Sequence, residues 1–149
     1  MDFKSLNKTV MERLRKELPS HLTYHNTRHV RDVLQAVRDI AFEEGIRGEE
    51  LTLLETAALL HDTGFLFSAE NHEELSCTLA AEYLPRYGYP ETAIRKVQEM
   101  IRATRIPQHP NNLPEKILAD ADLDYLGRDD FFTIGNRLYR VPPYRGSEK

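Results

Sequence analysis

Four residues of this sequence have the types and the spacing of a metal-binding site: His29, the adjacent pair His61-Asp62, and Asp122. Apolar residues recur at helical spacing around His29, His61 and Asp122, so each of these is expected on the inward face of a different helix. Burying an unpaired polar or charged group is unfavourable. A divalent ion would neutralise both carboxylates and accept both imidazoles. Such a mixed nitrogen and oxygen ligand set suits Mn, Fe, Co, Ni or Zn.

Each of these residues also has a structural interpretation. A single inward histidine is usually a hydrogen-bonded core residue, and a single inward aspartate can cap a neighbouring helix. Four such groups directed inward from three predicted helices favour the ion. One choice stays open within the run DADLD. The apolar stripe favours Asp122, whereas a helix that begins one turn later would present Asp120 as the ligand.

The elements that position these residues are all expected to be helices, because no run of strict apolar and polar alternation occurs. Capping residues, glycines and prolines divide the periodic stretches from one another. The predicted fold class is all-α, a single bundle of about six to seven helices over residues 1–140, with 141–149 as a flexible tail. The helices are predicted at about 3–18, 26–44, 49–62, 71–87, 90–104 and 114–127, with a short one after Asp129 or Asp130.

Composition excludes several classes of function. The chain is 40% hydrophobic and 30% charged, which is ordinary for a soluble domain. A net charge of −4 and a pI near 5.9 provide no basic face for nucleic acid. No apolar stretch is long enough to span a membrane, and a single cysteine, Cys77, excludes an intramolecular disulfide. We therefore expect a cytoplasmic protein with no membrane or nucleic-acid partner; its oligomeric state stays open.

The candidate metal ligands and their order in the chain also resemble the signature of a known family. The segment HDTG at 61–64, preceded by His29 and followed by ADLD at 121–124, resembles the HD superfamily of metal-dependent phosphohydrolases. The signature of that superfamily is a histidine, a His-Asp doublet and a distant aspartate. The segment YHNTRHVRDV at 24–33 looks like the opening motif of its cyclic-nucleotide phosphodiesterase branch.

The resemblance implies roles for individual residues. His29, His61, Asp62 and Asp122 take the metal-ligand positions, with Asp62 as the bridge if two ions bind. His25 matches the histidine that protonates the leaving oxygen in the phosphodiesterase branch; its other interpretation is a loop residue beside a helix start. Many members carry a further histidine where Thr104 stands, which implies an incomplete second metal site.

Further candidates lie in the segment AENHEELS, which resembles a recurrent stretch after the doublet in a bacterial subgroup. His72 shares an apolar stripe with Leu75 and Leu79, so it is expected to face inward towards the substrate or a ligand. Glu73 could orient the attacking water, or it could simply favour the positive end of its helix. Guanidinium groups match phosphate geometry, so Arg28, Arg102 and Arg105 could hold a phosphate or be solvated.

Together these features predict an enzyme: a metal-dependent phosphohydrolase, either a phosphomonoesterase or a phosphodiesterase. It would cleave a nucleotide or another small phosphorylated metabolite by a metal-activated water. The expected cofactor is a divalent ion, Mn, Fe, Ni, Co, Zn or Mg. The main alternative is a regulatory module that binds a nucleotide in the same pocket without hydrolysing it, and the intact ligand set argues against that alternative. A helical bundle without any ligand ranks third.

Overall fold

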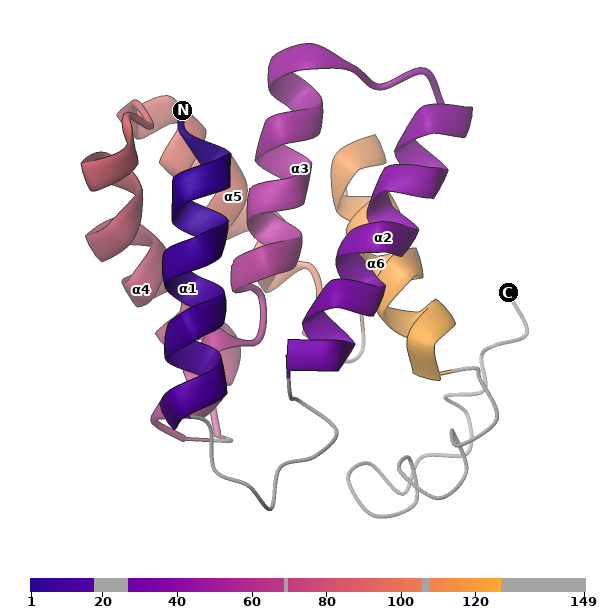
Figure 1. Cartoon of the computed structure of the whole chain (residues 1–149). Helices are drawn as coiled ribbons and strands as arrows, with labels where there is room; N and C mark the ends of the chain where they lie inside the picture. Colours follow the sequence, from indigo (N-terminus) through magenta and orange to yellow (C-terminus); the bar gives the residue numbers. More distant parts are fainter. Residues whose placement is uncertain (18–26, 69, 106–107, 127–149) are drawn as a thin grey trace.

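The computed structural model describes residues 1–17, 27–68, 70–105 and 108–126, and within these ranges the fold is all-α, as predicted (Figure 1). The helices are α1 (Phe3–Glu17), α2 (Thr27–Glu43), α3 (Gly48–Leu60), α4 (His72–Tyr83), α5 (Glu91–Arg102) and α6 (Leu113–Leu126). Two short 3₁₀ helices join them, η2 (Thr63–Leu66) and η3 (Leu84–Tyr87). The predicted short helix after Asp129 or Asp130, the tail at 141–149 and His25 lie outside the described residues.

Helix α3 is the centre of the bundle. It packs mainly against α2 and α5 and also touches α1, α4 and α6, so it lies between the α1–α4–α5 side and the α2–α6 pair (Figure 1). Its last residues are all fully buried, which agrees with its nearly continuous apolar sequence: Thr56, Ala57, Ala58, Leu59 and Leu60. Because this end of α3 is fully buried, it brings the residues that follow it, His61 and Asp62, into the core.

The ends of α3 and α4 differ from the prediction in ways that bear on the site. The helix expected over 49–62 ends at Leu60, and the chain then turns through Asp62 into η2. The helix expected over 71–87 ends as an α-helix at Tyr83 and continues as η3, which has Pro85 in its first turn. Proline lacks the amide hydrogen that an α-helix needs, so a tighter turn forms there. Gly88, at φ +84°, ends this segment in the left-handed region.

The core joins all six α-helices of the described chain. Leu6 and Val10 of α1, Val33 and Val37 of α2, and Val97 of α5 are buried together with α3. Their spacing of three or four residues within a helix is the apolar stripe that the sequence predicted. None of the helices within the described ranges has the length and hydrophobicity needed to cross a membrane.

Candidate metal centre

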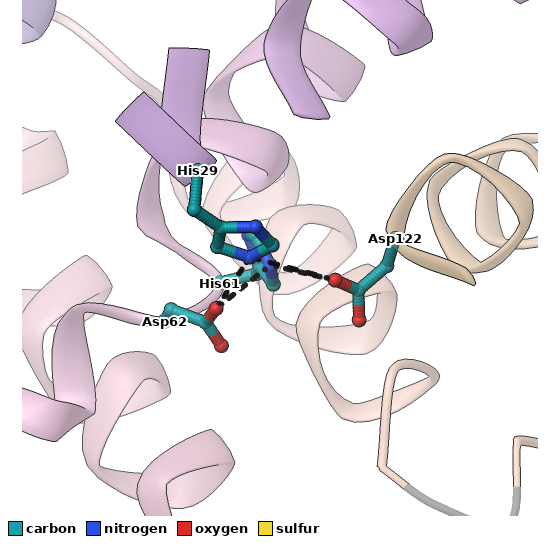
Figure 2. A group of neighbouring side chains, drawn as sticks. All are labelled: His29, His61, Asp62 and Asp122. Atoms are coloured by element: carbon teal, nitrogen blue, oxygen red, sulfur yellow. Dashed lines mark hydrogen bonds and ion pairs between the residues drawn. The ribbon is translucent and has the colours of Figure 1, made fainter. Parts of the chain in front are cut away.

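The four residues singled out in the sequence meet at one point of the bundle (Figure 2). His29 comes from the first turn of α2, His61 and Asp62 directly follow α3, and Asp122 comes from α6. One possible ligand atom from each residue lies within 4.8 Å of the others. His29 and His61 are fully buried, and Asp62 is 7% exposed. The fold therefore gathers two imidazoles and two carboxylates at one place, with the histidines buried and the Asp122 side chain 16% exposed.

The nitrogen and oxygen atoms of this cluster face one another. Nε2 of His29 lies 3.0 Å from Oδ2 of Asp62 and 3.7 Å from Oδ1 of Asp122. Nε2 of His61 lies 3.2 Å from Oδ2 of Asp62 and 3.4 Å from Oδ1 of Asp122. Both imidazoles thus direct Nε2 towards the same two carboxylates, and dashed lines in Figure 2 mark contacts of the histidines with Asp62 and Asp122.

The protonation of His61 tests whether a cation fits here. Its Nδ1 lies 2.7 Å from the carbonyl oxygen of Ala58, which only accepts, so Nδ1 carries the hydrogen. In the neutral ring Nε2 then presents a lone pair to two carboxylates, and it forms no well-directed hydrogen bond within the described chain. Burial lowers the pKa of His61, but Asp62 and Asp122 outweigh it and hold that pKa well above its usual value. The lone pair of Nε2 and the two negatively charged carboxylates repel one another, and a proton or a metal ion between them would remove that repulsion. The residues present therefore fit a cation.

The turn that carries the doublet is packed tightly against α4. A Cβ at Gly64 would overlap the backbone carbonyl of His72, so only glycine allows this approach. The hydroxyl of Ser76 accepts a hydrogen bond from the Gly64 amide at 2.8 Å and donates one to the His61 carbonyl at 3.0 Å. The backbone on both sides of Asp62 is therefore held by one helix.

The same helix places His72 and Glu73 beside the cluster. Nε2 of His72 lies 3.3 Å from Oδ1 of Asp62 and 3.3 Å from Oε2 of Glu73. The His72 ring stacks on Phe65, with the ring centroids 4.1 Å apart. Burial lowers the pKa of His72, but the Asp62 and Glu73 carboxylates outweigh it and raise that pKa. Asp62 therefore faces the two buried histidines with one oxygen and His72 with the other.

Two partly exposed arginines, Arg102 and Arg105, contact the glutamates at the start of α4. Nε of Arg105 is 3.9 Å from Oε1 of Glu73, and its Nη2 is 3.4 Å from Oε2 of Glu74. Arg102 instead holds Glu74 with two hydrogen bonds, at 2.8 Å and 3.1 Å, and thereby lowers the pKa of Glu74. The Arg105 side chain is half exposed, so its guanidinium group faces both Glu73 and solvent.

The remaining candidates are not among the four residues of the cluster. The Asp120 side chain is 40% exposed and pairs with Lys116 at 3.2 Å, so the structure brings Asp122 and not Asp120 to the other three residues. Thr104 is buried and donates to the carbonyl of Ile101. Arg28 is exposed. Ser76 was missed in the sequence, although it lies one turn after His72 and so shares its inward face.

Comparisons with known proteins identify the family of the chain. The family model described as HD domain matches residues 27–124, well over half of the chain. A crystal structure described as a predicted HD superfamily hydrolase, from an uncultured Thermotogales bacterium, is similar to the whole bundle. It has a TM-score of 0.69 and 25% sequence identity, and the match covers 93% of this chain and 80% of that one. A search of the curated proteins finds no match.

Proposed function

Since the chain belongs to the HD domain family, we propose that it is a metal-dependent phosphohydrolase acting on a nucleotide or another small phosphorylated metabolite. The observation that carries the proposal is the convergence of His29, His61, Asp62 and Asp122, whose ligand atoms lie within 4.8 Å of one another. Buried carboxylates and imidazoles facing one another are the arrangement that a divalent ion stabilises.

These four residues would hold the ion. A divalent ion at this position supplies Lewis-acid stabilisation of phosphate oxygens and activation of a water molecule. The Ala58 carbonyl fixes the tautomer of His61 so that Nε2 is the ligand atom. His72 stands against Asp62 and keeps its second oxygen oriented.

The neighbouring residues supply the other requirements of phosphate ester hydrolysis. Arg105 offers guanidinium donors for the phosphate at the outer side of Glu73. Glu73, 9% exposed, orients the attacking water and takes its proton. The water oxygen forms a bond to phosphorus while the ester P–O bond breaks, and the leaving oxygen takes a proton from His25 or from solvent. The role of His25 stays a prediction from the resemblance.

The decisive experiment combines metal analysis with a substrate screen. Purified protein is analysed for divalent metals and then assayed on nucleotides and sugar phosphates with Mn, Ni, Co and Mg in turn. We expect bound metal and metal-dependent hydrolysis of a phosphate ester, both lost in His61→Ala. His109→Ala, which removes an exposed histidine, is the matched control. Undiminished turnover by metal-free protein in chelator contradicts the proposal, and nucleotide binding without any product supports the regulatory alternative.

A further inference from the structure

Ser76 connects α4 to the turn that carries the metal-binding doublet. It is fully buried, and its hydroxyl makes two hydrogen bonds, from the Gly64 amide at 2.8 Å and to the His61 carbonyl at 3.0 Å. Asp62 and Thr63 lie between these two residues, His61 and Gly64, in the chain. A single side chain therefore fixes both ends of the turn.

This turn needs such support because α3 ends at Leu60. Carbonyl groups at a helix end lack partners within the helix, and a buried one must find a partner elsewhere. Asp62 has φ −110° and ψ 9°, near the sparsely populated bridge region. A hydroxyl both accepts and donates, which the two facing backbone groups require, whereas the alanine side chain does neither.

We propose that Ser76 is a positioning residue of the metal centre. Its hydroxyl sets the direction in which the turn presents the His61 imidazole and the Asp62 carboxylate to the ion. The inference rests on the proposed function, because it assumes that these side chains bind a metal. The Ser76 hydroxyl bonds backbone atoms rather than the candidate ligand atoms, so it acts through the backbone of His61 and Gly64.

The test compares two buried hydroxyl groups. Ser76→Ala removes the hydroxyl at the turn. Thr56→Val is the matched control, because Thr56 is also fully buried and its hydroxyl bonds Tyr89 at 2.6 Å and the Thr52 carbonyl at 2.7 Å, within and beside α3. Co²⁺ affinity, the visible absorption spectrum of the Co²⁺-loaded protein and the melting temperature in chelator are measured for both.

We expect Ser76→Ala to weaken Co²⁺ binding about 10- to 100-fold and to shift the absorption bands, as loss of a supporting hydrogen bond does at metal sites. Thr56→Val should lower the melting temperature while leaving affinity and spectrum unchanged. Should Ser76→Ala fail to fold, Ser76→Cys keeps a similar shape with weaker hydrogen bonds and should give a smaller loss of affinity. Wild-type affinity and spectrum in the folded Ser76 variant overturn the proposal.

A second measurement separates this inference from the proposed function. Imidazole ¹⁵N–¹H correlation spectra of the metal-free protein report the surroundings of His61 and His72 directly. Ser76→Ala should shift both sets of signals, and Thr56→Val should shift neither. If wild-type protein binds no divalent ion, the proposed function fails, and unchanged imidazole signals in Ser76→Ala then overturn the positioning role as well.

Discussion

The Nδ1–H of His61 donates a hydrogen bond to the carbonyl of Ala58, three residues earlier in the chain, at 2.7 Å. This bond fixes both the tautomer and the ring orientation, so that Nε2 faces the carboxylates of Asp62 and Asp122. The end of α3 thus orients the imidazole of its own candidate metal ligand.

Metal removal should lower the thermal stability of the protein. A ligand that binds only the folded state at 100 times its Kd adds about 2.7 kcal/mol. For a chain of this size that corresponds to a melting temperature higher by about 5–10 °C. Differential scanning fluorimetry with Mn²⁺ and with chelator measures the shift. His61→Ala should melt at the same temperature in both conditions, while His109→Ala should behave as wild type.

Asp122 and Asp120 should differ sharply in their effect on metal binding. Asp122→Asn removes a charged group from the cluster and should abolish metal binding and turnover. Asp120→Asn removes only an exposed ion pair with Lys116, worth about 0.3–0.5 kcal/mol. Isothermal titration with Mn²⁺ measures both variants. Equal losses in the two would contradict the assignment of Asp122.

Arg105 should contribute to substrate binding. Arg105→Ala removes a charge-assisted hydrogen bond to phosphate, worth about 1.5–3 kcal/mol, and should raise KM roughly 10- to 100-fold with a smaller change in kcat. Arg102→Ala is the control, because Arg102 pairs with Glu74, whereas Arg105 contacts both Glu73 and Glu74. Steady-state kinetics on the best substrate of the screen distinguish them. Unchanged KM in Arg105→Ala would exclude this role.

Cys77 should make the folded protein less stable at alkaline pH. Burial raises the pKa of the Cys77 thiol from 9.0 to about 11, so the folded state favours the neutral thiol. The contribution of the neutral thiol to the free energy of unfolding is fully present below pH 9 and is lost as the pH rises from 9 to 11. With partial solvent screening this contribution amounts to about 1–2 kcal/mol. Urea unfolding at pH 8 and at pH 10.5 should show a larger loss in wild type than in Cys77→Ala. Equal losses would contradict the prediction.

Gly64→Ala should damage the metal centre more than another glycine substitution. The added Cβ would overlap the His72 carbonyl, so the turn must move away from α4. We expect a loss of about 1–3 kcal/mol together with weaker metal binding. Gly45 also has a positive φ, but an added Cβ there would meet no neighbouring atom. Gly45→Ala should therefore lower the stability of the fold without changing metal binding. Urea unfolding and Mn²⁺ titration compare the two, and normal metal affinity in Gly64→Ala would count against a role for this contact.

Much of the fold and of the cluster followed from helical periodicity. The phase of each apolar stripe indicated that His29, His61 and Asp122 face inward, and the structure places them together. Periodicity did not predict that α3 ends before the doublet; the turn that follows is held by Ser76 and lies close to His72 of α4, contacts that only the tertiary fold brings together. Likewise, the approach of Arg105 to Glu73 joins residues far apart in the chain, which only the tertiary fold brings together.

The candidate ligands are far apart in the chain: His29 lies near the start of α2, whereas Asp122 lies in α6, the last described helix. During synthesis the first three ligands emerge well before the fourth. A chain that ends after α5 lacks Asp122 and therefore carries only three of the four candidate ligands. If the proposed ion binds, its full coordination would require α6 to be in place, so metal binding would report that this last described helix has packed on the bundle.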